Sequence, residues 1–196
     1  MRFSLRLVPA PGQNRAIHFV TALVNNRPRS LVNNRPGLLW GGFMGKRIDL
    51  NAVQVSTGSG YPAPFDAPCA ARARQRLGDA AGLTDFGVNL LRLPAGAWSS
   101  QRHWHSAEDE FVYVLEGEAV LVTDSGEEIL RAGDCAGFKA GLRDGHHLQN
   151  RSPRDVVVLE IGSRKVADDE GEYPDIDLRF LKGDAGYARK NGTPVK

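Results

Sequence analysis

The chain of 196 residues is poor in several features that mark particular classes of protein. It has only two cysteines, Cys69 and Cys135, which are too few for a disulfide scaffold and do not form a metal-type pair. We expect Cys135 to be a small buried residue, because no activating partner for its thiol can be named. No apolar run approaches the roughly 20 residues that cross a bilayer. These absences predict a cytoplasmic protein that has no membrane partner.

Acidic residues are missing from the first 43 positions, which instead carry six arginines. This stretch contains a near-tandem repeat, Leu-Val-Asn-Asn-Arg-Pro at 23–28 and 31–36, without helix or strand periodicity. A basic arm for nucleic acid or membrane, and a targeting peptide, are two interpretations. We favour a third, in which residues 1–43 are a disordered or non-native extension and translation starts at Met44. Because no helix-turn-helix pattern is present, we predict no nucleic-acid partner.

A clear helical pattern is also missing from the rest of the chain, in which turn-forming glycine and proline are frequent. From about residue 72, short apolar stretches alternate with turn residues, as in antiparallel β proteins. The predicted strands cover residues 86–93, 110–116, 119–124, 128–131, 146–150 and 156–161. Residues 70–81 form either a helix or a strand. With a short strand at His103 and His105, and with residues 70–81 if these form a strand, there are seven or eight strands and no convincing helix between them. This predicts a single all-β domain, built as a sandwich or a barrel.

Four of the five histidines fall in two clusters, His103 with His105 and His146 with His147. Residues i and i+2 of a strand face the same side, so His103 and His105 project together, about 7 Å apart at Cα. Glu110 begins the next predicted strand. A carboxylate added to two imidazoles makes a three-ligand set that suits a transition metal and leaves positions open for other ligands.

The spacing of these residues resembles the two motifs of the cupin superfamily. The first motif is matched, with one extra residue before the first histidine, by Gly96, His103, His105, Glu110 and Gly117. The second is matched, with Lys139 in place of a proline and two extra residues before the histidine, by Gly133, Gly141, His146 and Asn150. The resemblance implies a double-stranded β-helix, a jelly-roll-like barrel. It also implies one divalent transition metal (Mn, Fe, Zn, Ni, Co or Cu) bound by His103, His105, Glu110 and His146.

The choice between His146 and His147 depends on spacing and on strand parity. The distance to Asn150 selects His146, which shares a strand face with Leu148. A barrel interior holds that face, so we expect Gln149 to lie outside. His147 is then an exposed residue, a residue that contacts a metal ligand without itself binding the metal, or the alternative ligand in place of His146.

Three further residues are weaker candidates for contacts with a substrate. Gln101 lies on the same strand face as His103, while Arg92 and Tyr113 would orient a substrate anion. Structural roles are the alternative for all three. The sequence names no catalytic base.

The resemblance is to small single-domain bacterial cupins of the oxalate-binding and sugar-phosphate-isomerase-like group. It implies a metal-dependent isomerase, decarboxylase, lyase or oxygenase that acts on a small oxygen-rich metabolite, a carboxylate or a sugar derivative. One alternative is a non-catalytic protein that binds or senses a small carboxylate such as oxalate through the metal. A second is a structural cupin without metal. Fold alone does not choose among these functions.

The predicted organisation has four parts and a homodimeric assembly. The extension at 1–43 is followed by a segment at 44–85 that packs on the barrel, the barrel at 86–165, and a tail at 166–196. The tail packs on the outside of the barrel or extends along a neighbouring subunit. We expect the homodimer because the resemblance implies it and because open sheet edges need covering.

Overall fold

The computed structural model describes residue 45 and residues 47–195, so the predicted extension at 1–43 and its repeat lie outside the described residues. Strands dominate the described chain, which confirms the all-β prediction. The strands are β1 (Val55–Thr57), β2 (Ala73–Arg76), β3 (Phe86–Leu93), β4 (Trp104–His105), β5 (Glu110–Glu116), β6 (Glu118–Thr123), β7 (Gly126–Arg131), β8 (Cys135–Phe138), β9 (His147–Gln149), β10 (Val156–Ser163), β11 (Gly171–Tyr173), β12 (Leu178–Phe180), β13 (Tyr187–Ala188) and β14 (Pro194–Val195). The helices are short: η1 (Leu50–Ala52), η2 (Ala67–Cys69), α1 (Leu77–Ala80) and η3 (Lys182–Asp184).

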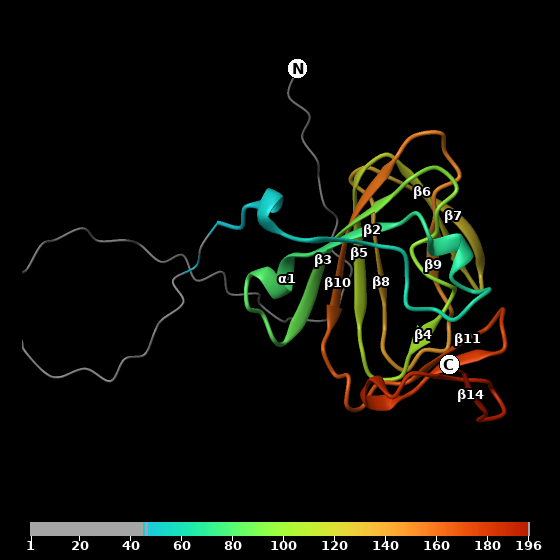
Figure 1. Cartoon of the computed structure of the whole chain (residues 1–196). Helices are drawn as coiled ribbons and strands as arrows, with labels where there is room; N and C mark the ends of the chain where they lie inside the picture. Colours follow the sequence, from blue (N-terminus) through green and yellow to red (C-terminus); the bar gives the residue numbers. More distant parts are fainter. Residues whose placement is uncertain (1–44, 46, 196) are drawn as a thin grey trace, which may run out of the picture. The chain divides into compact units, whose positions relative to one another are not determined.

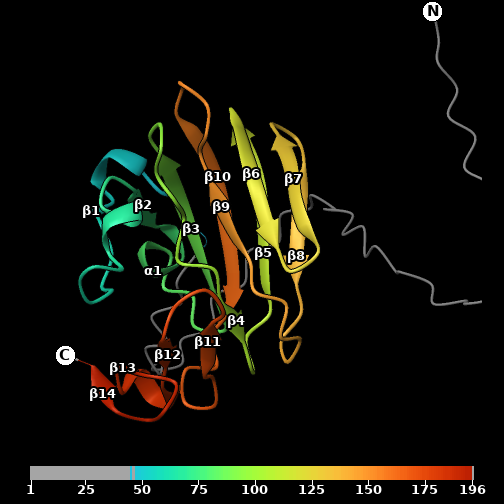
Figure 2. The same cartoon turned by 90° about the vertical axis from the view of Figure 1, so that its right-hand side faces the viewer.

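The strands form three antiparallel sheets (Figure 1). The largest has the order β1-β2-β3-β10-β5-β8, and the second has the order β7-β6-β9. The third, β14-β13-β12-β11-β4, gathers the C-terminal strands below the barrel in this view (Figure 1, Figure 2). Among the described residues, no helix is long and apolar enough to span a membrane.

The apolar core lies between the first two sheets and follows from strand alternation. Leu91 of β3, Val158 of β10 and Val114 of β5 lie opposite one another in register, and all three side chains are fully buried. Leu121 of β6 and Leu148 of β9 belong to the same cluster. Burying side chains of this size contributes about 1.5–3 kcal/mol each, so this alternation holds the barrel together.

The inward face of these strands becomes polar toward the end nearest the third sheet. Asn89 and Glu160 lie opposite each other on β3 and β10, one inward position beyond Leu91 and Val158. Glu110 starts β5 at this end. The hairpin from β5 to β6 turns at Gly117, where φ is +81° and a Cβ would lie 2.6 Å from the Asp155 carbonyl oxygen. Only glycine fits this turn.

The predicted strands at 86–93 and 110–116 coincide with β3 and β5. The undecided segment at 70–81 contains both alternatives, because β2 is followed at once by α1. One expectation was wrong. Cys135 is exposed, because it pairs with Tyr113 and both side chains face away from the core. Gln149 lies on the outer side of β9, as expected, but it is buried there, because Trp98 bridges to it and covers that side.

Candidate metal centre

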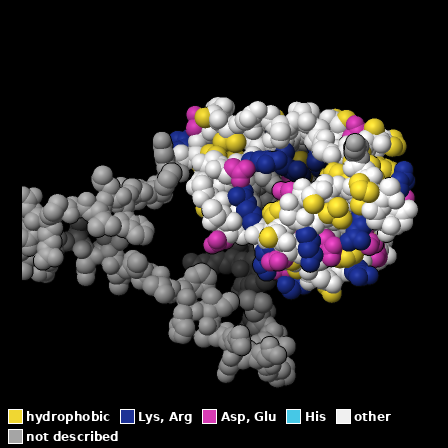
Figure 3. Space-filling view, turned by 60° about the horizontal axis from the view of Figure 1, so that its bottom comes forward, with side chains coloured by type: hydrophobic (Ala, Val, Ile, Leu, Met, Phe, Trp, Pro, Cys, Tyr) yellow, Lys and Arg dark blue, Asp and Glu magenta, His cyan; other side chains and the backbone are white. Residues whose placement is uncertain are grey.

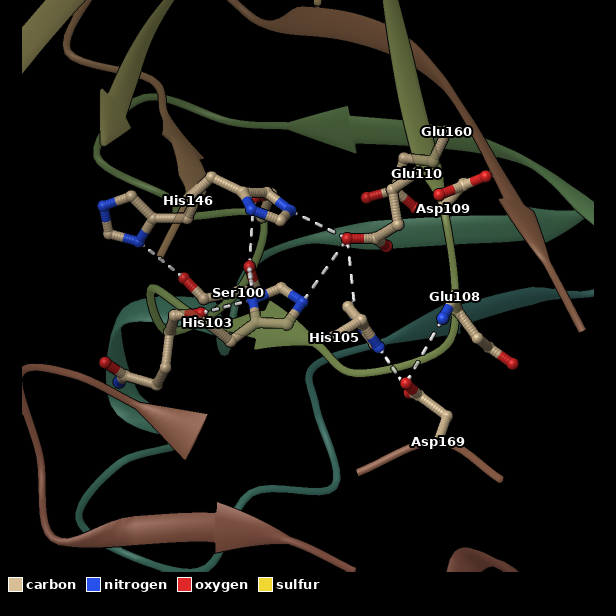
Figure 4. Close-up of polar contacts among 12 residues, drawn as sticks. Ser100, His103, His105, Glu108, Asp109, Glu110, His146, Glu160 and Asp169 are labelled. Atoms are coloured by element: carbon tan, nitrogen blue, oxygen red, sulfur yellow. Dashed lines mark hydrogen bonds and ion pairs between the residues drawn. The ribbon is translucent and has the colours of Figure 1, made fainter. Parts of the chain in front are cut away.

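Three imidazoles converge on one carboxylate at the polar end of the barrel (Figure 4). The Nε2 atoms of His146, His105 and His103 lie 2.8, 3.5 and 3.7 Å from Oε2 of Glu110. An isolated antiparallel bridge joins the backbones of His103 and His146, with N–O distances of 3.2 and 2.8 Å. The sequence pattern and the chain topology thus bring the four predicted ligands to one point.

The second nitrogen of each ring faces an oxygen atom. Nδ1 of His103 donates to the Gln101 carbonyl at 2.9 Å, and Nδ1 of His146 lies 3.3 Å from the Asp144 carbonyl. The His146 ring is also stacked on Phe138, with centroids 3.6 Å apart. These contacts turn each Nε2 atom toward Glu110, which is the orientation that metal binding through Nε2 requires.

His105 is held by a carboxylate that the sequence reasoning missed. Its Nδ1 lies 2.6 Å from Oδ2 of Asp169, whose other oxygen accepts from the backbone N–H of Ala107 at 2.8 Å and of Glu108 at 3.3 Å. Asp169 is buried, with 5% of its surface exposed. It lies in the C-terminal tail, within no motif, so no sequence signal distinguishes it from the neighbouring acidic residues.

The charge state of the cluster suits a cation. Burial raises the pKa of Glu110. The hydrogen bond from His146 and the charges of the imidazoles lower this pKa by more than burial raises it, so that it falls to about 2. Burial lowers the pKa of His103 to about 3, despite the nearby Glu110 carboxylate. For His105, burial lowers the pKa, but the hydrogen bond to Asp169 outweighs it and the net shift is upward. At neutral pH the carboxylate is therefore ionised and His103 is neutral, as metal ligands must be.

The cluster forms part of the wall of a cavity of about 580 Å³. Figure 3 shows dark blue Lys and Arg side chains beside a hollow on this face. Four arginines line the cavity: Arg72, Arg74, Arg76 and Arg164. The first three alternate along the strand that contains β2, and this period of two is a signal in the sequence that the prediction overlooked. Glu160 lies 2.9 Å from Arg74 and neutralises it.

The weaker predicted candidates lie elsewhere. Arg92 pairs with Asp155 at 3.2 Å on the outer side of β3, and Tyr113 is 39% exposed on the outer side of β5. Gln101 is buried and donates to the Phe65 carbonyl at 2.6 Å. None of the three is among the residues that line the 580 Å³ cavity.

His147 is buried on the side of β9 opposite His146. Its Nδ1 donates to the Ser100 carbonyl at 2.9 Å, and its Nε2 lies 2.8 Å from Nε2 of Gln149. Its ring packs against Trp98 with centroids 4.8 Å apart. Both ring nitrogens of His147 therefore make hydrogen bonds to groups other than Glu110. The prediction that His147 is an exposed residue is wrong.

The donor set fits a divalent transition metal. The ligating atoms of His103, His105 and Glu110 all lie within 4.8 Å of one another, and Nε2 of His146 contacts the same carboxylate. Imidazole nitrogens with one carboxylate suit Mn, Fe, Co, Ni, Cu or Zn better than Ca or Mg, which prefer oxygen ligands. Four such ligands would leave positions open on an ion that accepts five or six.

Comparison with known proteins gives the class. The Cupin domain family matches residues 89–162, which contain all four residues of the cluster. A sugar phosphate isomerase of the cupin superfamily from Silicibacter pomeroyi is 43% identical; the match covers 77% of this chain and 97% of that one, with a TM-score of 0.73. This chain therefore belongs to the cupin superfamily.

A second solved structure is similar over less of the chain. It is a putative sugar phosphate isomerase from Acidithiobacillus ferrooxidans, 29% identical, with 65% of this chain and 81% of that one covered and a TM-score of 0.58. No curated protein matches the chain.

Proposed function

We propose that this cupin is a metal-dependent isomerase of a small phosphorylated sugar. The observation that carries the proposal is the convergence of His103, His105, His146 and Glu110 on the wall of a cavity of about 580 Å³. A cavity of this volume suits a small metabolite. The similarity to a cupin from Silicibacter pomeroyi that is called a sugar phosphate isomerase supports the choice of reaction.

In this proposal the four clustered residues hold one divalent transition ion. When bound, the ion supplies a Lewis acid that polarises a carbonyl oxygen of the substrate. The chain's own residues keep the ligands in place: Asp169 holds the His105 ring, and Phe138 stacks on the His146 ring. Removing such supporting groups commonly weakens metal binding or activity.

The proposed reaction needs little beyond the cavity. Conversion of an aldose into a ketose moves one proton from C2 to C1, a second proton from the C2 hydroxyl to the C1 oxygen, and two electrons from C2 to C1, all within the substrate. It therefore requires no second substrate and no redox cofactor. Glu108 and Glu160 both line the cavity, so carboxylates are present beside the cluster.

The experiment combines metal analysis with an exchange assay. The full-length protein is purified and its metal content is measured beside His103→Ala and Glu110→Ala variants, with Arg92→Ala as a control on the outer face. A panel of aldose and ketose phosphates is then incubated in D₂O and followed by NMR. We expect deuterium at the carbon next to the carbonyl with the wild type and the control only. Wild-type protein that holds metal yet neither isomerises nor exchanges any member of the panel would contradict the proposal.

The predicted homodimer and cytoplasmic location belong to the same proposal. The outer side of β5 exposes Phe111, Tyr113 and Leu115, each at 39%, and an apolar row of this kind favours a second copy of the chain as its cover. Sedimentation equilibrium of the purified protein and fractionation of the producing cells test the two parts. A protein that sediments as a monomer at micromolar concentration would contradict the proposed homodimer.

A further inference from the structure

The inward surface beside Glu110 is bare backbone across two strands. Glu110 on β5 lies directly opposite Gly162 on β10, and Gly162 lies directly opposite Gly87 on β3. Both glycines line the cavity. Neighbouring strands are about 4.8 Å apart, so Gly87 lies about 10 Å from Glu110 across this row. The row forms a trough whose middle position has no side chain.

A guanidinium occupies the far end of the trough. A Cβ built on Gly87 would lie 3.6 Å from Nε and 3.7 Å from Nη2 of Arg164. The Arg164 side chain therefore covers Gly87 at van der Waals distance from the position of a Cβ. Its Nη1 donates to the Leu83 carbonyl at 2.8 Å, and its Nη2 pairs with Asp79. These contacts hold the guanidinium in position over the strand.

Arg76 adds a second guanidinium at the same end. It lies opposite Asn89, which is one inward position from Gly87 along β3. Its side chain is 69% exposed, and its ion contact in the described chain is Asp79, at 4.0 Å. Asp79 is thus one carboxylate between two guanidiniums, each of which has five N–H donors. This group of three carries a net positive charge and unused donors.

We propose that Arg164 and Arg76 form the subsite for the phosphate group of the substrate. This inference rests on the proposed function and names the residues that would select a phosphorylated sugar. The carbonyl end of the substrate lies at the histidine cluster, the carbon chain crosses Gly162, and the phosphate reaches the guanidiniums. Guanidinium groups bind phosphate oxygens through paired hydrogen bonds, so two of them give both affinity and orientation.

The test uses inorganic phosphate as the probe and isothermal titration of the metal-loaded full chain. The variants are Arg164→Gln, Arg76→Gln and the double variant. Arg92→Gln is the matched control, because Arg92 is also an ion-paired arginine of the same sheet but lies on its outer side. We expect at least tenfold weaker phosphate binding in the double variant and no change in the control, with equal metal content throughout. Binding by the double variant within twofold of the wild type would overturn the subsite.

A second titration separates the arginines from the metal as the phosphate partner. Glu110→Ala weakens the ligand set but leaves Arg164 and Arg76 intact, so we expect it to retain phosphate binding. Loss of phosphate binding in that variant would place the anion at the cluster and overturn the proposal.

Turnover separates the subsite from the proposed function. If the protein isomerises sugar phosphates and the double variant keeps the same kcat/KM, the subsite is wrong and the isomerase stands. If no sugar phosphate is turned over but the double variant loses phosphate, the isomerase is wrong and the anion subsite stands. Gly162→Val adds a steric test: it should keep metal and phosphate but lose turnover, because its side chain fills the trough. Unchanged turnover in that variant would show that the carbon chain of the substrate does not cross Gly162.

Discussion

Replacing Asp169 with asparagine should weaken metal binding although Asp169 does not itself face the metal position. The carboxylate accepts hydrogen bonds on both oxygens: His105 Nδ1 at one, and the backbone N–H groups of Ala107 and Glu108 at the other. An asparagine has only one accepting oxygen and offers an NH₂ group in place of the second. It cannot satisfy both sides.

Either orientation of the asparagine has a cost. If its oxygen keeps the backbone N–H groups, its NH₂ faces Nδ1 of His105, and the ring must move its proton to Nε2, the atom that faces Glu110. That tautomer cannot bind a metal through Nε2. If the oxygen instead faces His105, two half-buried backbone N–H groups lose their acceptor, which costs at most about 1–3 kcal/mol for each such group. The first orientation retains more hydrogen bonds, so we expect the tautomer change.

The expected loss is about 10- to 100-fold in metal affinity, the usual effect of removing a carboxylate behind a histidine ligand. Competition with a coloured chelator measures it. Asp177→Asn is the control, because Asp177 also belongs to the C-terminal tail and also accepts from a side chain, Nη1 of Arg189 at 3.1 Å, and from a backbone N–H, that of Lys190 at 2.9 Å, neither of which contacts the cluster. Wild-type metal affinity in the Asp169→Asn protein would refute the reasoning about the tautomer.

Other predictions concern stability. Gly117→Ala should lower the free energy of unfolding by about 3 kcal/mol, because a Cβ there adds a backbone clash to an unfavourable φ. Gly96→Ala should lower it by only about 1 kcal/mol, because Gly96 has a similar φ of +80° but open space around the position of a Cβ. Asn150→Ala should cost about 2 kcal/mol or more, because its buried amide makes four hydrogen bonds of 2.7–2.9 Å. Metal at 100 times its dissociation constant should stabilise the wild type by about 2.7 kcal/mol, and the same metal concentration should stabilise Glu110→Ala much less, because only the three imidazoles remain.

Urea denaturation measures all of these differences. Equal losses in the two glycine variants would show that the close approach at Gly117 has no energetic effect. A stable Asn150→Ala protein would show that water replaces the buried amide. Equal stabilisation of wild type and Glu110→Ala by metal would place the bound ion elsewhere.

Local pattern was enough to predict much of the fold and to single out candidate ligand residues. Apolar alternation in 86–93 and 110–116 coincides with β3 and β5, because a strand with one buried face must alternate. The spacing of His103 and His105 predicted a shared face for the same reason. Glu110 followed as a carboxylate at the start of the next predicted strand, the family resemblance added His146, and the structure brings all four side chains together.

What covers each face was decided only by the tertiary structure. Period-two patterns show which residues point the same way, but not whether the outer side meets solvent. Cys135 was expected to be buried and is exposed, whereas Gln149 faces outward as expected and is nevertheless buried. Asp169 contacts His105 although the two residues are 64 positions apart. Arg164, which follows directly after the end of β10, covers Gly87 near the start of β3. Such contacts depend on which distant strands become neighbours, and the interactions that select those neighbours are spread over the whole core rather than encoded in any short segment.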